Sequence, residues 1–306
     1  MATDYRARIE RALRFIGERH AQPLTLRDVA RAAALSEFHF HRVFSAVMGE
    51  SVGQFVTRTR LERAAFRLAY EPDASVTEIA EGAGYSSVSN FSKAFSARFA
   101  LAPTGVRERE ALPAALAKRR ASAPRSREPT GLYALPREAS AAERERRYAK
   151  LARSVRFERT PARTLACLAS ANGYAFAAIE AAWRELVERA LQLGLPEPLD
   201  AYGLPFDSPQ LTQPELCRYH ACVACPVALA LAPPLFRSEL PAGRYAVFPY
   251  AGAARRVEDT YRAIYSVWLP RSSLRPDDFT PVNHYVKGGP VRGQIEMEIW
   301  IKVRGK

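Results

Sequence analysis

Apolar residues recur at helical spacing through the first third of the chain, although one stretch looks like a strand at first sight. Residues 35–44, LSEFHFHRVF, alternate phenylalanine and histidine at their centre, as a half-buried strand does. On a helix, the same residues place Phe40 and Phe44 on one face and Arg42 on the opposite face. Ser36 can cap a helix that begins directly after it. We therefore predict a helix with a buried phenylalanine stripe.

This pattern returns about fifty residues further on. Phe40 recurs as Phe91, and a second phenylalanine follows four residues later in each copy. An internal repeat of this kind indicates one supersecondary unit that is present twice. Arg42 and Lys93 occupy equivalent positions. Each copy is thus predicted to point one cation outward from the middle of its second helix.

Each copy also opens with a helix start signal. Thr25 precedes Asp28 by three residues, and Ser75 precedes Glu78 by three. At this spacing a hydroxyl and a carboxylate can satisfy the unpaired amides of a helix N-terminus. A short helix, a tight turn and a longer helix then follow, twice over, with residues 51–70 as the connecting helix. The N-terminal part is therefore predicted to be an all-α double helix-turn-helix.

The second half of the chain contains a different repeat, at an offset of 78 residues. A strand-like segment precedes a helical pattern in each copy, and further strand-like segments follow it. The matched helical positions are Ile179, Trp183 and Leu186 in the first copy and Val257, Tyr261 and Ile264 in the second. We predict an α+β domain made of a duplicated strand-helix-strand-strand module. Two such copies would bring antiparallel sheets edge to edge and leave a central groove for a ligand.

A basic stretch separates the two halves. Residues 113–152 are rich in Ala, Pro, Ser and Arg with little apolar periodicity, which is typical of a linker, with a short charged helix predicted from Ala139 onward. The chain is accordingly divided into an N-terminal domain over residues 1–112, this linker, and a C-terminal domain over residues 153–306. The assignment of functions to these domains depends on the chemistry described next.

Charge and cysteine content narrow the class of protein. The formal net charge is +13 over 306 residues, which makes a polyanionic partner plausible. The segment 113–160 carries 13 Lys and Arg against 5 Asp and Glu, whereas residues 1–112 carry 16 against 13. Four cysteines are too few for a disulfide framework, and no apolar run approaches the roughly 18 residues of a membrane span. We expect a bacterial, cytoplasmic protein without a membrane partner.

The two outward cations fit the chemistry of base recognition in the major groove. Arg or Lys can donate to guanine O6 and N7, His or Ser can bond either base edge, and an exposed Phe can contact a thymine methyl group. Two such helices on one stiff connecting helix could enter successive grooves of double-stranded DNA. Further cations could meet phosphates, namely Arg58, Arg60, Arg98, Arg107 and Arg109.

At this point the residues resemble a family. The segment IAEGAGYSSVSNFSKAFSARFALAP is similar to the second helix-turn-helix of the AraC/XylS transcription regulators, with Ala100 where that family usually has Gly. The resemblance covers residues 5–110. It implies that the base-facing positions are Phe38, His41 and Arg42 in the first unit and Ser89, Asn90 and Lys93 in the second; Ser45 lies on the same outward face.

The C-terminal half resembles the GyrI-like effector-binding domains. The resemblance rests on ELCRYHACV, ELPAGRYAVFPYAG, VWLP and EMEIWIKV. It implies a groove for lipophilic, frequently cationic compounds, lined by aromatic residues and a Glu on the penultimate strand, where this chain has Asn283. The candidate ligand residues are Trp183, Tyr219, Tyr245, Trp268, Asn283, Tyr285, Glu298 and Trp300. Any one of the aromatic residues could instead fill the core.

The leading hypothesis is a transcription regulator that responds to a small effector and has RNA polymerase as a further possible partner. The alternative is a GyrI-like hydrolase or sequestering domain, with Glu298 or His220 as the base. Nothing in the sequence forms a Ser-His-Asp or Cys-His signature, so no enzyme activity and no cofactor are predicted. Metal binding is not predicted either, because the two histidines His39 and His41 point in different directions on a helix.

Overall fold

The computed structural model divides the chain into two compact units, Met1–Ser126 and Arg127–Lys306, and each is described by itself. The structure describes residues 5–71, 73–107, 140–207, 212, 216–277, 280–286 and 294–305. Most of the predicted linker therefore lies outside the described residues. The charged helix predicted at its end is present as α8.

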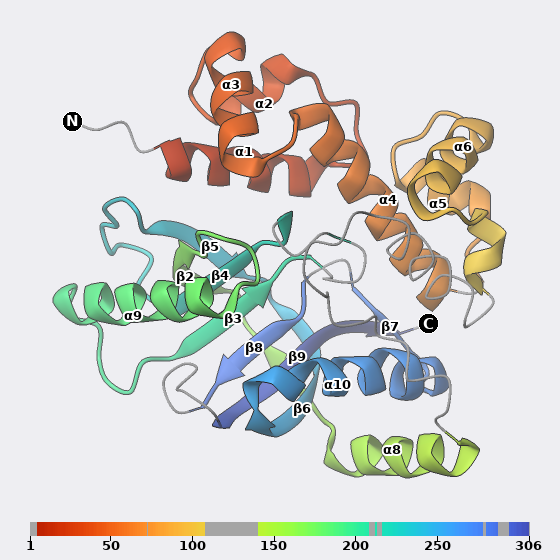
Figure 1. Ribbon diagram of the computed structural model, residues 1–306. Helices are drawn as coiled ribbons and strands as arrows, with labels where there is room; N and C mark the ends of the chain where they lie inside the picture. The colour runs from red at the N-terminus through yellow and green to blue at the C-terminus, as the bar shows by residue number, and fades with distance from the viewer. Residues whose placement is uncertain are drawn as a thin grey trace. The chain divides into compact units, whose positions relative to one another are not determined.

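The described part of the N-terminal unit is helical, as predicted (Figure 1). The first helix-turn-helix consists of α2 and α3, the second of α5 and α6, and α4 is the predicted connecting helix. The elements are α1 (Tyr5–Arg19), α2 (Leu26–Ala32), α3 (Glu37–Met48), α4 (Val52–Tyr70), α5 (Val76–Gly82), α6 (Val88–Phe99) and the 3-10 helix η1 (Pro103–Arg107).

The predicted capping residues begin these helices. Thr25 accepts a hydrogen bond from the Asp28 amide at α2, and Ser75 accepts one from the Glu78 amide at α5. In both cases the carboxylate accepts from the backbone amide of the cap residue, so the full capping box is formed. The two helix-turn-helix units thus begin with the same local chemistry.

The phenylalanine stripes form the core beneath both recognition helices. Phe40 and Phe44 of α3 are fully buried, with ring centroids 5.4 Å apart. Phe91 and Phe95 of α6 repeat this arrangement at the same 5.4 Å. Burying each such ring stabilises the unit by about 2 kcal/mol relative to exposure. This packing confirms the helical interpretation of LSEFHFHRVF and fixes which face of each helix is free.

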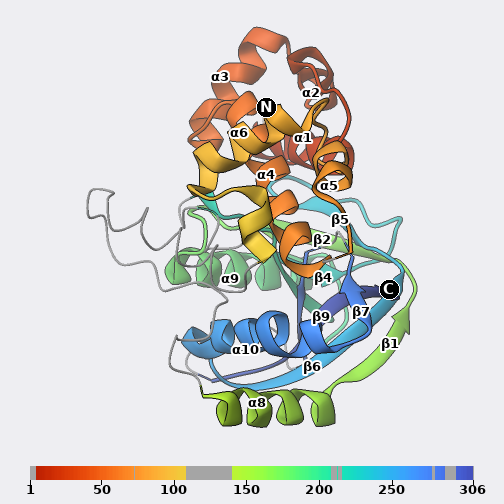
Figure 2. The same ribbon diagram turned by 90° about the vertical axis from the view of Figure 1, so that its right-hand side faces the viewer.

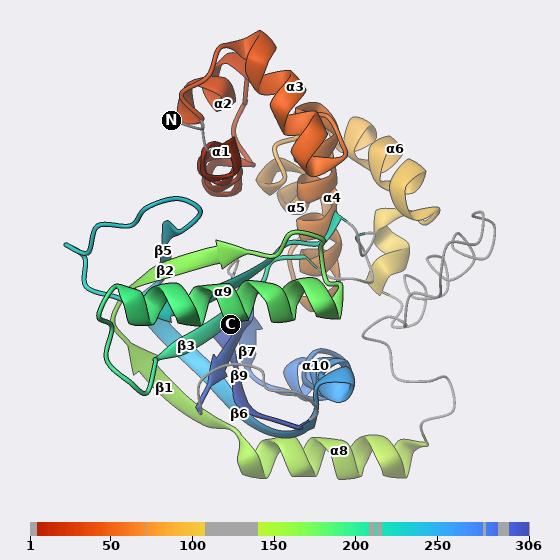
Figure 3. The same cartoon turned by 60° about the vertical axis from the view of Figure 1, so that its left-hand side comes forward.

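The C-terminal unit is built on one antiparallel sheet in the order β1-β6-β9-β8-β3-β4-β2-β5, with β7 beside β9. Figure 3 shows that the sheet is strongly bent. The elements are α8 (Ala141–Ser154), β1 (Arg156–Thr160), β2 (Arg163–Ala169), α9 (Phe176–Gln192), β3 (Ala201–Pro205), β4 (Tyr219–Ala224), β5 (Phe236–Leu240), β6 (Gly243–Ala253), η3 (Ala254–Arg256), α10 (Val257–Ala263), η4 (Ile264–Trp268), η5 (Leu269–Arg271), β7 (Leu274–Pro276), β8 (Val282–Tyr285) and β9 (Gln294–Gly305).

The predicted duplication is visible in the strand order, and the two antiparallel halves meet edge to edge, as predicted. The central pair β3 and β8 hydrogen-bond to each other, with Gly203 opposite Asn283, so the halves form one continuous sheet. The outer strands are exchanged between the halves: β1 pairs with β6, and β5 pairs with β2. Strand β1 directly precedes β2 along the chain but pairs in the second half. Strand β5 directly precedes β6 but pairs in the first half.

Helices cover one face of this sheet. Helix α9 packs on β2 and β4, and α10 packs on β6. On β8, Asn283 contacts α10 and Tyr285 contacts α9, so the two helices share one face, called here the helix face. The opposite face carries a buried cluster that includes Leu165, Tyr202 and Trp300. The predicted groove must therefore be sought between α9 and α10, over the β3–β8 pair.

Candidate functional site

Helix α3 presents the first group of predicted DNA contacts. Phe38 keeps 74% of its surface exposed, which decides against the alternative of a partly buried cap residue. The Arg42 guanidinium carbon lies 5.7 Å from the Phe38 ring centroid, a cation–π distance. His41 is exposed beside them, and Ser45 is half-buried one turn further on. An aromatic ring and a cation are thus held together at an accessible tip of the helix.

Helix α6 presents a second, smaller and more polar group. Ser89, Asn90 and Lys93 are all exposed, on the side away from the buried rings. Ser87 accepts a hydrogen bond from the Asn90 amide, which fixes the start of the helix. Hydroxyl, amide and ammonium groups at this position can all donate to base edges in a major groove. The two helices therefore offer different hydrogen-bonding groups on equivalent backbones.

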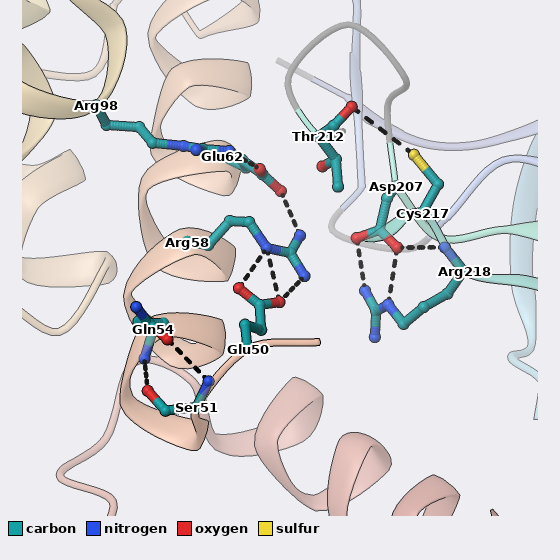
Figure 4. A network of polar contacts seen from close by, with 10 residues as sticks. All are labelled: Glu50, Ser51, Gln54, Arg58, Glu62, Arg98, Asp207, Thr212, Cys217 and Arg218. Carbon is teal, nitrogen blue, oxygen red and sulfur yellow. Dashed lines mark hydrogen bonds and ion pairs between the residues drawn. The ribbon is translucent and has the colours of Figure 1, made fainter. Parts of the chain in front are cut away.

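Arg58 does not have the role that its sequence position suggested. Only 5% of the residue is exposed, and its guanidinium lies 2.6 Å from a Glu50 oxygen and 3.2 Å from a Glu62 oxygen (Figure 4). Glu62 also accepts from Arg98 at 2.8 Å, which ties α4 to α6. The prediction of a phosphate contact is therefore wrong for Arg58, because the group is buried and fully engaged.

The other predicted phosphate contacts differ in their surroundings. Arg60 is half-buried and donates to the carbonyls of His20 and Gln22, at 2.6 and 2.8 Å. Arg60 and Arg98 thus already have partners inside the unit, which gives them a role in packing rather than at a phosphate. Arg107 remains exposed and donates to the Ala74 carbonyl. Arg109 lies outside the described residues.

In the C-terminal unit, three predicted ligand residues meet on the helix face of the sheet. The Trp183 indole N–H donates to the Tyr219 hydroxyl at 3.0 Å, and the hydroxyls of Tyr219 and Tyr285 lie 3.1 Å apart. The three side chains come from α9, β4 and β8. Burial raises the pKa of Tyr219 well above its ordinary value and that of Tyr285 to about 12. Both phenols are therefore neutral near pH 7 and offer hydrogen bonds without charge.

Asn283 continues this row towards α10. Its side-chain oxygen accepts from the Tyr261 hydroxyl at 2.5 Å, and both residues are buried. Tyr261 was not among the predicted ligand residues, although it is the repeat equivalent of Trp183. That equivalence was the signal that could have identified it. We call Trp183, Tyr219, Tyr261, Asn283 and Tyr285 the aromatic row.

The remaining predicted ligand residues lie elsewhere, so the prediction of one shared groove is wrong. Tyr245, Glu298 and Trp300 point to the sheet face opposite the helices, because successive residues on a strand alternate sides. Trp268, the last residue of η4, packs against Phe248, with ring centroids 4.9 Å apart. These four side chains are therefore separated from the aromatic row by the sheet or by packing.

Glu298 belongs to a row of linked polar side chains, Arg156, Glu298, His284 and Asp200, which we call the charge chain. It accepts from the Trp300 indole at 3.0 Å and from Arg156 at 2.6 Å, and His284 lies between Glu298 and Asp200. Burial opposes ionisation of Glu298, but the hydrogen bonds from Trp300, Arg156 and His284 outweigh it and lower the carboxyl pKa. The Glu298 carboxylate thus already has hydrogen-bond and ion-pair partners within the protein.

The comparisons with known proteins agree with this division of the chain. Residues 29–109 match the model of a helix-turn-helix domain, and residues 153–304 match that of a GyrI-like small molecule binding domain. The chain joins an AraC-type helix-turn-helix to a GyrI-like domain. Regulators of the AraC family are thus among the relatives of its N-terminal domain, and its C-terminal domain matches GyrI-like small molecule binding domains.

Relatives of the AraC-type domain include two regulators of known name. Regulatory protein PocR of Salmonella typhimurium is 30% identical over 106 residues, which cover 35% of this chain and 35% of PocR. Transcriptional activator NphR of Rhodococcus is 37% identical over 84 residues, which cover 28% of this chain and 24% of NphR. The C-terminal domain of AraT from Geobacillus stearothermophilus is a similar structure, with 29% identity, a TM-score of 0.33 and coverage of 35% and 88%. The chain matches about a third or less of each curated relative's length.

Two further features of this AraC-type, GyrI-like chain concern other kinds of site. Among the described residues, no group of three His, Cys, Asp or Glu side chains is placed to hold a metal ion. Cys217 and Cys222 are buried, and His220 packs between the rings of Phe206 and Phe236. No helix in the described part of the chain is long and apolar enough to span a membrane.

Proposed function

We propose that this chain is a transcription regulator that binds double-stranded DNA through α3 and α6 and responds to a small effector. The observation that carries the DNA part is the matched pair of exposed cations, Arg42 and Lys93, above buried phenylalanine stripes. Helix α4, which is about 28 Å long at 1.5 Å per residue, connects the two units. This length suits recognition helices that enter successive major grooves, about 34 Å apart.

The bases read by the two helices should differ, because the exposed groups differ. Arg42 can donate two hydrogen bonds to guanine, and the Phe38 ring beside it can contact a thymine methyl group. Asn90 can pair with adenine, and Lys93 with guanine. Arg107 and further surface cations would contact phosphates, which set the register without reading sequence. Arg109 remains a proposed phosphate contact from the sequence.

We place the effector at the aromatic row, over the seam between β3 and β8. The hydrogen-bonding groups of the aromatic row are three neutral phenols, an indole N–H and an amide, all at least nine-tenths buried. Glu298, the nearest equivalent of the acidic residue expected from the resemblance, lies on the other face of the sheet. An uncharged aromatic effector therefore fits this chain better than a cationic one.

The effector would be bound and not chemically changed. Glu298 and His220, the two candidate bases, are held by Trp300 and Arg156 in one case and by two phenylalanine rings in the other. Effector binding would then shift the protein between two states that differ in DNA affinity or in contact with RNA polymerase, in the bacterial cytoplasm.

The DNA proposal is tested with a duplex selected from a random library by the full chain. Gel-shift titrations would compare this duplex with a scrambled one for the wild type and for Arg42→Ala and Lys93→Ala. Each substitution should cost about 1–3 kcal/mol on the selected duplex and less on the scrambled one. Equal losses on both duplexes would overturn the assignment of these residues to base recognition.

The effector proposal is tested by thermal shift of the full chain against matched pairs of uncharged and cationic aromatic compounds. A ligand present at 100 times its Kd stabilises the folded state by about 2.7 kcal/mol. The uncharged member of a pair should raise the melting temperature, and Tyr219→Phe should reduce that shift. Tyr245→Phe, on the other sheet face, is the matched control. A stronger shift with the cationic members would contradict the proposal.

A further inference from the structure

Helix α8 carries a row of cations along its outer side. Arg146, Lys150 and Arg153 are spaced four and three residues apart, so they lie on one face of the helix. All three are exposed, and none forms an ion pair with any of the described residues. At 1.5 Å per residue the row is about 10 Å long. We call these three residues the basic row.

The acidic residues of α8 do not neutralise this row. Glu143 pairs with Arg147 at 2.6 Å, and Glu145 pairs with Arg271 at 2.8 Å. Both carboxylates are thus engaged by cations outside the row. The three charges of the basic row therefore add up on one surface, where like charges within one helix repel each other by a few tenths of a kcal/mol per pair. The row weakens the helix slightly, so folding of α8 does not explain it.

Packing of α8 does not explain the row either. Leu151 is the only buried residue of α8, and the helix packs on η4 and β6; Figure 2 shows α8 beside β6. The Arg271 guanidinium lies 4.8 Å from the Tyr148 ring centroid and fixes the inner side of the helix. Nothing in these contacts requires cations on the outer side. The basic row is therefore available to a partner.

The charge distribution along the chain indicates what that partner is. The helix-turn-helix segment, residues 1–112, has 16 Lys and Arg against 13 Asp and Glu. Of those cations Arg58, Arg60 and Arg98 are engaged inside the unit. The net charge of this segment is only +3, although phosphate contacts supply most of the sequence-independent affinity for DNA. The segment 113–160, which contains α8, has an excess of eight positive charges, 13 against 5.

We propose that the basic row binds phosphates of the same DNA duplex that α3 and α6 read, outside the part that they contact. This inference rests on the proposed function. A protein partner fits the row less well, because α8 exposes no large apolar side chain in its described residues, and protein interfaces depend on buried aromatic or aliphatic anchors. A closely spaced, purely cationic row matches a polyanion whose charges are as closely spaced.

The test measures how the affinity of the full chain for DNA depends on salt. Each phosphate contact contributes about 0.9 to the slope of log K against log salt. The double variant Arg146→Gln/Lys150→Gln should lower this slope by about two and the affinity at ~0.1 M salt by roughly 50-fold. Gln keeps the helix propensity of α8. Selected and scrambled duplexes of about four helical turns should lose affinity equally.

The matched control is Arg159→Gln/Arg184→Gln, which removes two exposed cations of the same unit from β1 and α9. It should leave the slope within about 0.3 of the wild type. If the α8 variant behaves like this control while the wild type still prefers the selected duplex, the proposed function stands and the basic row does not bind DNA. Loss of affinity for an acidic protein partner without any change in DNA binding would equally overturn the proposal. If the wild type shows no sequence preference, the proposed function itself fails.

Discussion

Gly49 and Ala100 end the two recognition helices in the same left-handed backbone conformation, with φ of 70° and 55°. Each donates its amide to the carbonyl four residues earlier, Ser45 in one case and Ser96 in the other. An L residue with a Cβ atom pays about 1 kcal/mol or more for this conformation, whereas glycine does not. The second helix-turn-helix therefore carries a strain that the first one avoids.

Ala100→Gly should accordingly raise the free energy of unfolding by about 1 kcal/mol. Urea denaturation of the full chain, followed by circular dichroism, would measure it. Gly49→Ala is the reciprocal control and should destabilise by a similar amount. Gly84→Ala should cost more, because its Cβ would lie 2.7 Å from the Ala21 carbonyl oxygen in addition to the positive φ of 77°. No change for Ala100→Gly would show that the cap does not limit stability.

The buried position of Arg58 leads to a second prediction, which separates stability from DNA contact. Arg58→Ala leaves Glu50 and Glu62 nearly buried without their shared cation, and should lower the free energy of unfolding by about 3 kcal/mol. Arg42→Ala, at an exposed position, should change it by less than about 0.5 kcal/mol. Under conditions where both variants are folded, Arg58→Ala should keep the wild-type salt slope of DNA binding. If the salt slope of Arg58→Ala is lower than that of the wild type by about one, Arg58 does contact a phosphate.

The exposure of Phe38 gives a third prediction. Phe38→Ala should not destabilise the unit, since 74% of the residue already faces solvent. It should lower the affinity for the selected duplex about tenfold and relax the preference at one base pair, because a contact to a thymine methyl group is lost and Arg42 is less well oriented. Val47→Ala on the same helix, also exposed, is the matched control. A loss of stability instead of specificity would assign Phe38 to packing.

The N-terminal fold could be predicted in detail because its signals are local. Capping boxes such as that of Thr25 and Asp28 mark helix starts, and a stripe such as Phe40 and Phe44 marks the buried face. The sequence did not show which arginines are exposed and which are buried in ion pairs. Arg42 and Arg58 look alike in sequence, and only the fold brings Glu50 and Glu62 to one of them.

The C-terminal unit was harder to predict, since its determinants are non-local. Strand β3 is weakly marked in the sequence, because AYGLP is short and contains Gly203 and Pro205. The exchange of β1 and β5 between the halves is a matter of pairing, which no single segment specifies. The ligand residues were placed in one groove because the sheet is buried on both faces, so hydrophobic alternation does not show which face Trp300 or Tyr285 occupies.

Tyr219 is the centre of the aromatic row and supports a fourth prediction. Tyr219→Phe removes the acceptor of the Trp183 N–H and leaves that donor buried without a partner, which should cost about 1–3 kcal/mol of stability. Tyr245→Phe removes only a hydrogen bond to the Pro241 carbonyl and should cost about 1 kcal/mol. Urea denaturation of the two variants compares them directly. Equal costs would indicate that Trp183 finds another acceptor when the hydroxyl is removed.

The charge chain at Glu298 predicts how stability depends on pH. The folded pKa of Glu298 is lowered from about 4.5, because hydrogen bonds from Trp300, Arg156 and His284 outweigh burial. A carboxyl whose pKa is lower in the folded than in the unfolded state contributes stability that is fully present above the unfolded value. That contribution is lost as the pH falls through the folded value. The free energy of unfolding of the wild type should therefore exceed that of Glu298→Gln at about pH 6, and the difference should shrink towards about pH 3.

Two further variants complete the test of this pH dependence. Asp200 lies on the other side of His284, and its own pKa is lowered although burial opposes this, through hydrogen bonds with His284 and Tyr202. Asp200→Asn should thus show the same trend as Glu298→Gln. Glu197→Gln, at an exposed position after α9, should have little effect at either pH. A difference between wild type and Glu298→Gln that is constant from about pH 6 to about pH 3 would mean that the side chain contributes by packing and not by its charge.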